Sequence, residues 1–271
     1  MEPWVWKALA CLALAFAAFA AGQGGQRWMP RAGFWLWLAL LGFVAWWWSG
    51  SWSMAVGGLL LWFLVPAVQA LWLSRQLRFS RRRRLVAGAI DYEEFPEINR
   101  VSRDVRGEGF KVLGDYWLKP SPFEQGYRLF VHGEEPILAA AAVVRQGGLA
   151  MHYHILLTWD GEGRAWLTWD YPLAYGLAMP PEFQVHRCLE AEGWPELLAQ
   201  HREFLVLNGV EAAGCRGGLE DVREFDRVLQ AVLRHNLRAG ILCRQEGDEV
   251  AYNWRGSLMV GWQVVREMVA G

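Results

Sequence analysis

The sequence predicts a membrane protein in two parts: three transmembrane helices in the amino-terminal region, then a soluble α+β domain with an antiparallel β-meander. Three observations support this prediction. Apolar stretches fill most of residues 1–74, a cluster of arginines follows them, and short alternating strands separated by turn-forming spacers dominate the middle of the remaining chain. With 271 residues, the chain is long enough for one or two domains.

The longest apolar stretch covers residues 54–73 and contains no charged side chain. An α-helix rises 1.5 Å per residue, so about 20 such residues cross a hydrocarbon layer about 30 Å thick. Two earlier stretches, at about 4–21 and 34–48, are also apolar. Each of the three is therefore predicted to be a transmembrane helix.

Six arginines follow the third stretch: Arg75, Arg78, Arg81, Arg82, Arg83 and Arg84. Arginines beside a span stay on the cytoplasmic side, so we expect an integral protein of the cytoplasmic membrane with a cytoplasmic carboxy-terminal domain. Residues 75–90 are predicted to be a polybasic juxtamembrane connector. Its arginines are candidates for contacts with anionic lipid headgroups, each worth about 1 kcal/mol. The alternative is that they only fix the topology.

Charge also decides how the first apolar stretch is interpreted. Its alanine-rich centre and the Ala18-Phe19-Ala20 triplet are typical of a cleaved signal peptide as well. Cleavage after export would leave Arg27, Arg31 and the later arginines outside, against the usual distribution. We expect three spans with the amino terminus outside; the alternative is a two-span hairpin with the first segment lying at the interface.

Tryptophans gather near the ends of the predicted spans. Those expected at the membrane interfaces are Trp28, Trp46, Trp47, Trp48, Trp52 and Trp72. The indole ring favours headgroup depth, where the ring is buried and its N–H stays hydrated. Polar groups within the spans are few, Gln69 being the clearest, which argues against a transport pathway.

The two halves of the chain differ in charge. Residues 1–84 hold nine of the 27 basic residues and one of the 28 acidic residues, which leaves a net charge of about −9 for the rest. An acidic domain repels phosphate backbones, so no nucleic acid is expected as a partner. The four cysteines lack metal-binding spacing, and the odd number after Arg84 argues against a disulfide framework.

The soluble α+β domain is predicted over residues 91–271. Apolar positions three or four apart predict helices at 91–106, 195–208, 217–240 and 257–269. Alternating runs predict strands at 110–118, 127–132, 137–145, 149–159 and 164–169, with a last hairpin at 241–254. The short spacers between the strands favour antiparallel pairing.

Two copies of the sequence Leu-Thr-Trp-Asp, at 157–160 and 167–170, flank an Asp-Gly turn. We expect a packed hairpin with tryptophans and threonines on opposite faces, rather than a stacking platform for a ligand. His201 lies on an apolar helical face and is expected to be a core or boundary residue.

His152 and His154 are the candidate metal ligands, because residues two apart in a strand project from the same face. Asp160 or Asp170 would complete such a site. No catalytic motif or nucleotide-binding loop is present in the sequence, so no cofactor is expected.

We therefore expect a membrane-anchored cytosolic interaction or regulatory module, alone or as a subunit of a larger membrane complex. Its expected partners are the lipid bilayer, including anionic lipids, and a partner protein or a second copy of the chain. The alternative is a membrane-associated hydrolase or metal-dependent enzyme with a site near His152, His154 and the Asp160–Asp170 hairpin.

Overall fold

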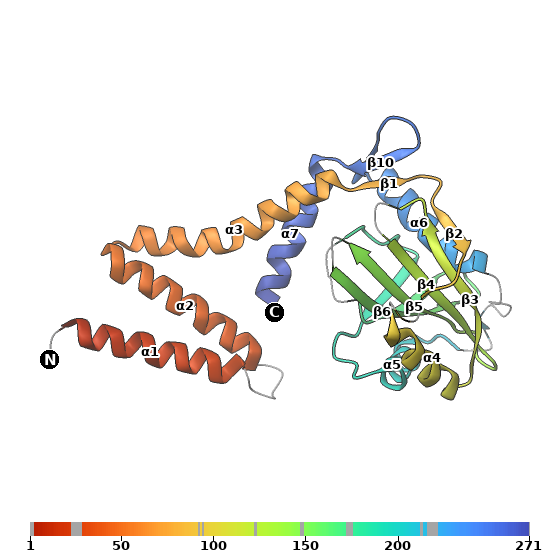
Figure 1. The fold of residues 1–271 in the computed structure, drawn as a ribbon, viewed down its shortest axis with the longest axis horizontal. Coiled ribbons are helices and arrows are strands. Elements are labelled where there is room, and N and C mark those ends of the chain that lie inside the picture. The colour runs from red at the N-terminus through yellow and green to blue at the C-terminus, as the bar shows by residue number, and fades with distance from the viewer. Residues whose placement is uncertain are drawn as a thin grey trace. The chain divides into compact units, whose positions relative to one another are not determined.

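The computed structural model describes residues 3–22, 29–91, 93, 95–121, 124–146, 149–171, 176–211, 214–215 and 222–270. The chain divides into two compact units. The helical unit comprises Met1–Arg75 and Ser257–Gly271, and the sheet domain comprises Gln76–Gly256. Figure 1 shows the elements of both units along the chain.

The helical unit begins with three helices, α1 (Pro3–Gly22), α2 (Met29–Ser49) and α3 (Trp52–Gln76). Helix α1 lies along α2 (Figure 1). Helix α2 meets α3 where Gly42 faces Leu59: a Cβ atom added to Gly42 would come within 3.2 Å of that side chain.

Two of these helices contain segments long and apolar enough to cross a membrane, Ala32–Ser49 and Trp52–Gln76. Only 17% and 6% of their apolar windows are buried, so neither resembles the core helix of a soluble protein. The apolar part of α1, Val5–Ala20, is shorter, and at 1.5 Å per residue it spans only about 24 Å. The structure thus supports two of the three predicted transmembrane helices, and a crossing by α1 stays a prediction.

The sheet domain is built on a seven-stranded sheet with the order β2-β3-β4-β5-β6-β7-β8. Its strands are β2 (Arg84–Ala87), β3 (Phe110–Lys119), β4 (Glu124–His132), β5 (Leu138–Gln146), β6 (Leu149–Trp159), β7 (Ala165–Trp169) and β8 (Phe183–Arg187). Neighbours from β2 to β7 pair antiparallel, which confirms the predicted meander. Strand β8 was not predicted, and it pairs parallel to β7.

Helices cover both faces of this sheet. Helices α4 (Pro96–Gly107) and α5 (Trp194–Leu207) pack on one face, with Phe130 and Leu156 in their shared core. Helix α6 (Val222–Arg238) packs on the other face, with Leu157 in its core. Successive strand residues point to opposite faces, so Leu156 and Leu157 reach different cores.

The predicted last hairpin is confirmed as β9 (Leu242–Arg244) and β10 (Glu249–Tyr252). Strand β1 (Arg78–Ser80) joins it as a third strand, giving the order β1-β10-β9. Only Leu77 separates α3 from β1. The last helix, α7 (Trp254–Ala270), follows β10 after Asn253 and ends in the helical unit.

Candidate functional site

The arginine segment passes through two strands of the sheet domain. In β1, Arg78 pairs with Ala251 of β10, and in β2, Arg84 pairs with Lys119 of β3. These pairings fix the backbone at both ends of the segment. Five of the six arginines are exposed: Arg75, Arg78, Arg81, Arg82 and Arg84.

Arg83 is the exception, with 6% of its surface exposed. Its guanidinium carbon lies 5.4 Å from the centre of the Phe79 ring, and its backbone carbonyl accepts a hydrogen bond from the Gln230 side chain. Burial lowers the pKa of Arg83, and the nearby Tyr127 partly offsets this shift. In this conformation the Arg83 side chain packs on Phe79 inside the sheet domain and is out of reach of a lipid headgroup.

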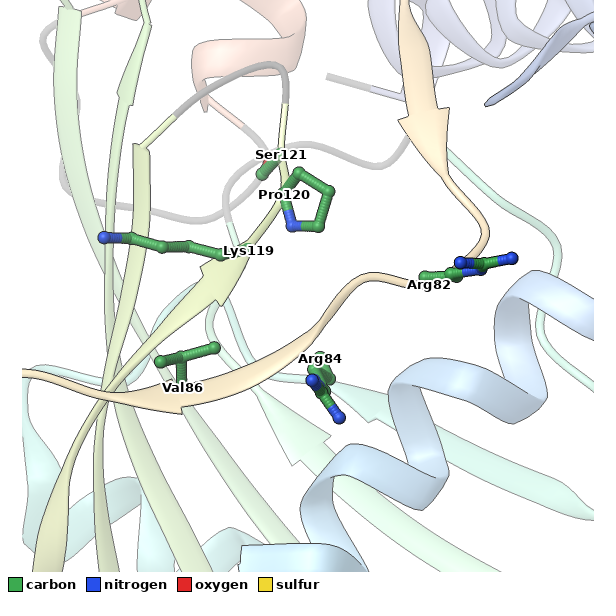
Figure 2. Close-up of a pocket in the computed structure, with 6 residues that line it drawn as sticks. All are labelled: Arg82, Arg84, Val86, Lys119, Pro120 and Ser121. Atoms are coloured by element: carbon green, nitrogen blue, oxygen red, sulfur yellow. The ribbon is translucent and has the colours of Figure 1, made fainter. Parts of the chain in front are cut away.

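A pocket of about 810 Å³ opens beside β2 and the end of β3. It is lined by Arg82, Arg84, Val86, Lys119, Pro120 and Ser121, and we refer to it as the basic pocket. Figure 2 shows Arg82 and Lys119 toward opposite sides of this pocket, with Arg84 between them. The cationic groups are spread out and do not converge on one point, an arrangement that suits an extended anionic surface.

Arg82 also forms an ion pair at the edge of this region. Its Nε atom lies 2.8 Å from Oδ2 of Asp248, and the two side chains are 81% and 42% exposed. Such an exposed pair is screened by salt and contributes at most about 1 kcal/mol. Arg82 can therefore exchange this partner for another anion at small cost.

The predicted hairpin places His152 and His154 on the same face of β6, with ring centres 6.0 Å apart. His154 Nδ1 lies 2.6 Å from Asp170 Oδ2, and the His154 backbone N–H donates to Asp170 Oδ1 at 2.5 Å. The His154 ring also packs edge-on against Trp194. His154 thus contacts both His152 and Asp170.

Asp160 lies elsewhere. It is six residues from His154 along the β6 strand and its extension, or about 20 Å at strand spacing. Its carboxylate accepts hydrogen bonds from Arg164 Nε and Trp166 Nε1 at 2.7 and 3.1 Å. Burial raises its pKa, but these hydrogen bonds prevail and lower the pKa of Asp160 to about 2. Asp160 therefore stabilises the turn and does not join the histidines.

In the part of the chain that the structure describes, no three His, Cys, Asp or Glu side chains form a group that could hold a metal ion. The metal site at His152 and His154 stays a prediction, with Asp170 already bonded to one imidazole nitrogen. Cys188 is buried nearby, and burial raises the pKa of its thiol to about 11. A thiol with so high a pKa is a poor nucleophile at neutral pH.

The two repeated threonines have a partner that the sequence motif does not reveal. Thr158 Oγ1 lies 3.0 Å from His201 Nε2, and Thr168 Oγ1 lies 2.8 Å from His201 Nδ1. His201 is fully buried, as its apolar surroundings predicted, and burial lowers its pKa to about 3. Thr158 and Thr168 of the near-repeat therefore hold the neutral imidazole of His201, from α5, against the sheet.

Tryptophans cluster at the turn between α2 and α3. Trp46 stacks on Trp52 with ring centres 5.3 Å apart, while Trp48 is 93% exposed. Trp72, near the other end of α3, is also exposed. Trp47 is partly buried, and Trp28 lies outside the described residues. The predicted interfacial positions are thus at the helix ends where the structure describes them.

No protein-family model, curated protein or solved structure matches this chain. Its function therefore has to be inferred from its own geometry. Two features are not explained by folding alone and bear on function: the exposed apolar helices and the basic pocket that follows them in the chain.

Proposed function

We propose that this chain is a membrane-anchored interaction or regulatory module whose sheet domain lies in the cytoplasm and contacts anionic lipid through the basic pocket. The observation that carries the proposal is the direct connection between α3 and the sheet domain. A single residue, Leu77, separates the apolar helix from β1. Arg84 follows Leu73 by eleven residues, so the chain holds it within about 40 Å of the apolar stretch.

The surface of α3 supports the membrane anchor. Large apolar side chains are exposed on it: Val56, Leu60, Leu61, Trp62, Leu64, Val65, Val68, Trp72 and Leu73. Soluble monomers rarely expose so large a contiguous apolar surface. A lipid environment removes this penalty, and the arginines after Leu73 favour a cytoplasmic position for the sheet domain.

A contact between α1 and α2 supports the three-span arrangement with the amino terminus outside. The Lys7 ammonium lies 5.5 Å from the centre of the Trp46 ring. Trp46 is near the end of α2 that meets the external loop in this arrangement. Lys7 would then lie at the same external surface, where an ammonium group can reach water.

The experiment for the anchor is a topology measurement on the full chain in native membranes. We expect the protein to stay in the membrane during alkaline extraction, and a reporter fused after Gly271 to be active only on the cytoplasmic side. Recovery of the chain in the soluble fraction would contradict the anchor. An external reporter would contradict the orientation alone.

The lipid contact is tested by exchanging three charges of the basic pocket in the variant R82Q/R84Q/K119Q. We expect less anionic phosphatidylglycerol to copurify with this variant, as measured by native mass spectrometry. The matched control, R100Q/R103Q/R106Q, removes three exposed arginines of α4. An equal loss of anionic lipid in both variants would show that only total charge matters. A protein subunit that copurifies would identify the predicted partner.

A further inference from the structure

Helix α7 has a buried face and an exposed apolar face. Ser257 and Val260 are 0% and 5% exposed, whereas Leu258, Trp262 and Val269 are 50%, 66% and 44% exposed. At 3.6 residues per turn, the three exposed residues fall within about 40° of the helix circumference. We call Leu258, Trp262 and Val269 the apolar stripe; Trp254, 68% exposed, extends it by one turn.

The buried face of α7 meets α3 at a close approach. A Cβ atom added to Gly261 would come within 3.1 Å of the Ala67 carbonyl oxygen. Glycine permits this approach because it brings no side chain into the contact, as small residues do between membrane helices. At this point α7 therefore touches the helix that the proposed function places across the membrane.

The position of this contact along α3 indicates how deep in the membrane α7 would lie. Ala67 precedes Leu73, the last residue of the apolar stretch, by six residues. This corresponds to about 9 Å along the axis of α3. Helices that lie in a membrane interface bury their apolar face about 5–10 Å into the boundary between headgroups and acyl chains. The contact thus lies at the depth of an interfacial helix.

The composition of α7 agrees with this depth. Residues 256–265 carry no charge, and the exposed Arg255 and Arg266 lie on either side of this segment. Tryptophan is the side chain most suited to headgroup depth, and Trp262 is at the centre of the stripe. Arginines beside such a stripe can reach the headgroup phosphates.

We propose that α7 is an interfacial membrane helix, and that its apolar stripe is covered by lipid of the same leaflet as the carboxy-terminal part of α3. This inference rests on the proposed crossing of the membrane by α3. The bilayer is the occupant because α7 contacts α3 at Gly261, and the exposed apolar side chains of α3 need the same lipid to cover them. The chain would then be attached to the membrane on both sides of the sheet domain.

The test measures the reactivity of introduced cysteines toward a water-soluble maleimide in phosphatidylcholine nanodiscs that hold one copy of the full chain. The variants are Trp262→Cys in the stripe, Leu64→Cys on the exposed surface of α3, and Glu246→Cys in the exposed β9–β10 turn. Peptide mass spectrometry reads each site separately, so the four native cysteines can stay. We expect position 262 to react at least tenfold more slowly than position 246, and equally fast after denaturation in SDS.

Three results would overturn the inference, and they are distinguishable. If position 262 reacts as fast as position 246 while position 64 is protected, α7 is not in lipid but the membrane anchor stands. If positions 262 and 64 both react fast, the proposed crossing by α3 fails as well. If position 262 is protected only in nanodiscs that hold two copies, a second chain covers the stripe instead of lipid.

Discussion

Arg128 donates two parallel hydrogen bonds to Asp115, from Nε to Oδ1 and from Nη2 to Oδ2, both 2.7 Å long. The pair joins β3 to β4 on the face covered by α4, where Arg128 also donates to Ser102 Oγ at 3.0 Å. Burial raises the pKa of Asp115 and lowers that of Arg128, so each charge depends on its partner.

Asp115→Asn is therefore expected to lower the free energy of unfolding by about 3 kcal/mol, because it removes the carboxylate that forms two hydrogen bonds with the buried Arg128 guanidinium. Near-UV circular dichroism during chemical denaturation of the full chain in detergent would measure this. The control is Glu124→Gln, which removes one charge from the exposed pair Glu124–Arg145 of the same sheet. The control should cost at most about 1 kcal/mol. Equal losses would show that Asp115 and Arg128 act as a surface pair.

Because His201 is neutral in the folded chain, we expect the free energy of unfolding to depend on pH. Its pKa is about 3 in the folded chain against an ordinary value of 6.5, so between these values the unfolded chain binds a proton that the folded chain does not. The contribution of His201 to the free energy of unfolding is fully present above pH 6.5. It falls by about 1.4 kcal/mol per pH unit as the pH decreases toward 3. Between pH 6.5 and 5 the loss is about 2 kcal/mol.

The variant T158V/H201L/T168V removes this titration and leaves no unpaired polar group at the site. Its free energy of unfolding should change less between pH 6.5 and 5 than that of the native chain. His235→Gln, on the partly exposed part of α6, should keep the native slope. The same slope in the triple variant would mean that His201 is not the group responsible.

Arg83 and Arg81 are two residues apart but are expected to respond differently to alanine. Arg83→Ala removes a buried side chain that packs on Phe79, and should destabilise the sheet domain by about 2 kcal/mol. Arg81→Ala changes an exposed residue and should stay within about 0.5 kcal/mol. Thermal unfolding of the two variants measures the difference, and equal midpoints would contradict the buried position of Arg83. Variants that test lipid binding should therefore retain Arg83.

Gly256 should not tolerate a side chain. A Cβ atom there would lie 2.2 Å from the Ile241 carbonyl oxygen, whereas one at Gly107 would meet nothing within 4 Å. We expect Gly256→Ala to cost at least about 2 kcal/mol through overpacking. Gly107→Ala, at the end of α4, should be neutral or slightly stabilising. Limited proteolysis of both variants would report loosening where α7 begins, and equal resistance would argue against this close contact.

The spacing of apolar residues predicted those helices and strands whose own sequence determines which side is buried. Helices α4 to α7 and the meander from β3 to β7 follow regular apolar spacing, and each overlaps its predicted position. Helix α4 begins at Pro96, not at the predicted residue 91, because proline is favoured in the first turn of a helix. Part of the helix predicted at 217–240, residues 217–221, lies outside the described residues. Strands β1 and β2 were missed because they are only three and four residues long, begin with an arginine of the basic cluster, and pair with partners far away in the sequence.

The candidate site was predictable only in part. The sequence placed His152 and His154 on one face, but it could not separate Asp170, which bonds His154, from Asp160, which caps the turn. The run from Arg81 to Arg84 likewise gives no sign that Arg83 alone points inward, because that depends on Phe79 and on α6. Such distinctions arise from tertiary contacts that local patterns do not encode.

One residue, Leu77, separates α3 from β1, and one residue, Asn253, separates β10 from α7. These strands are neighbours, with Arg78 opposite Ala251, and antiparallel partners have Cα atoms about 5 Å apart. The points at which the chain enters and leaves the sheet domain are therefore adjacent. In topology, the sheet domain is an inserted domain between α3 and α7. Replacing residues 79–250 with a two-residue turn would join α3 to α7 through almost the same gap, so the helical unit and the sheet domain can change independently.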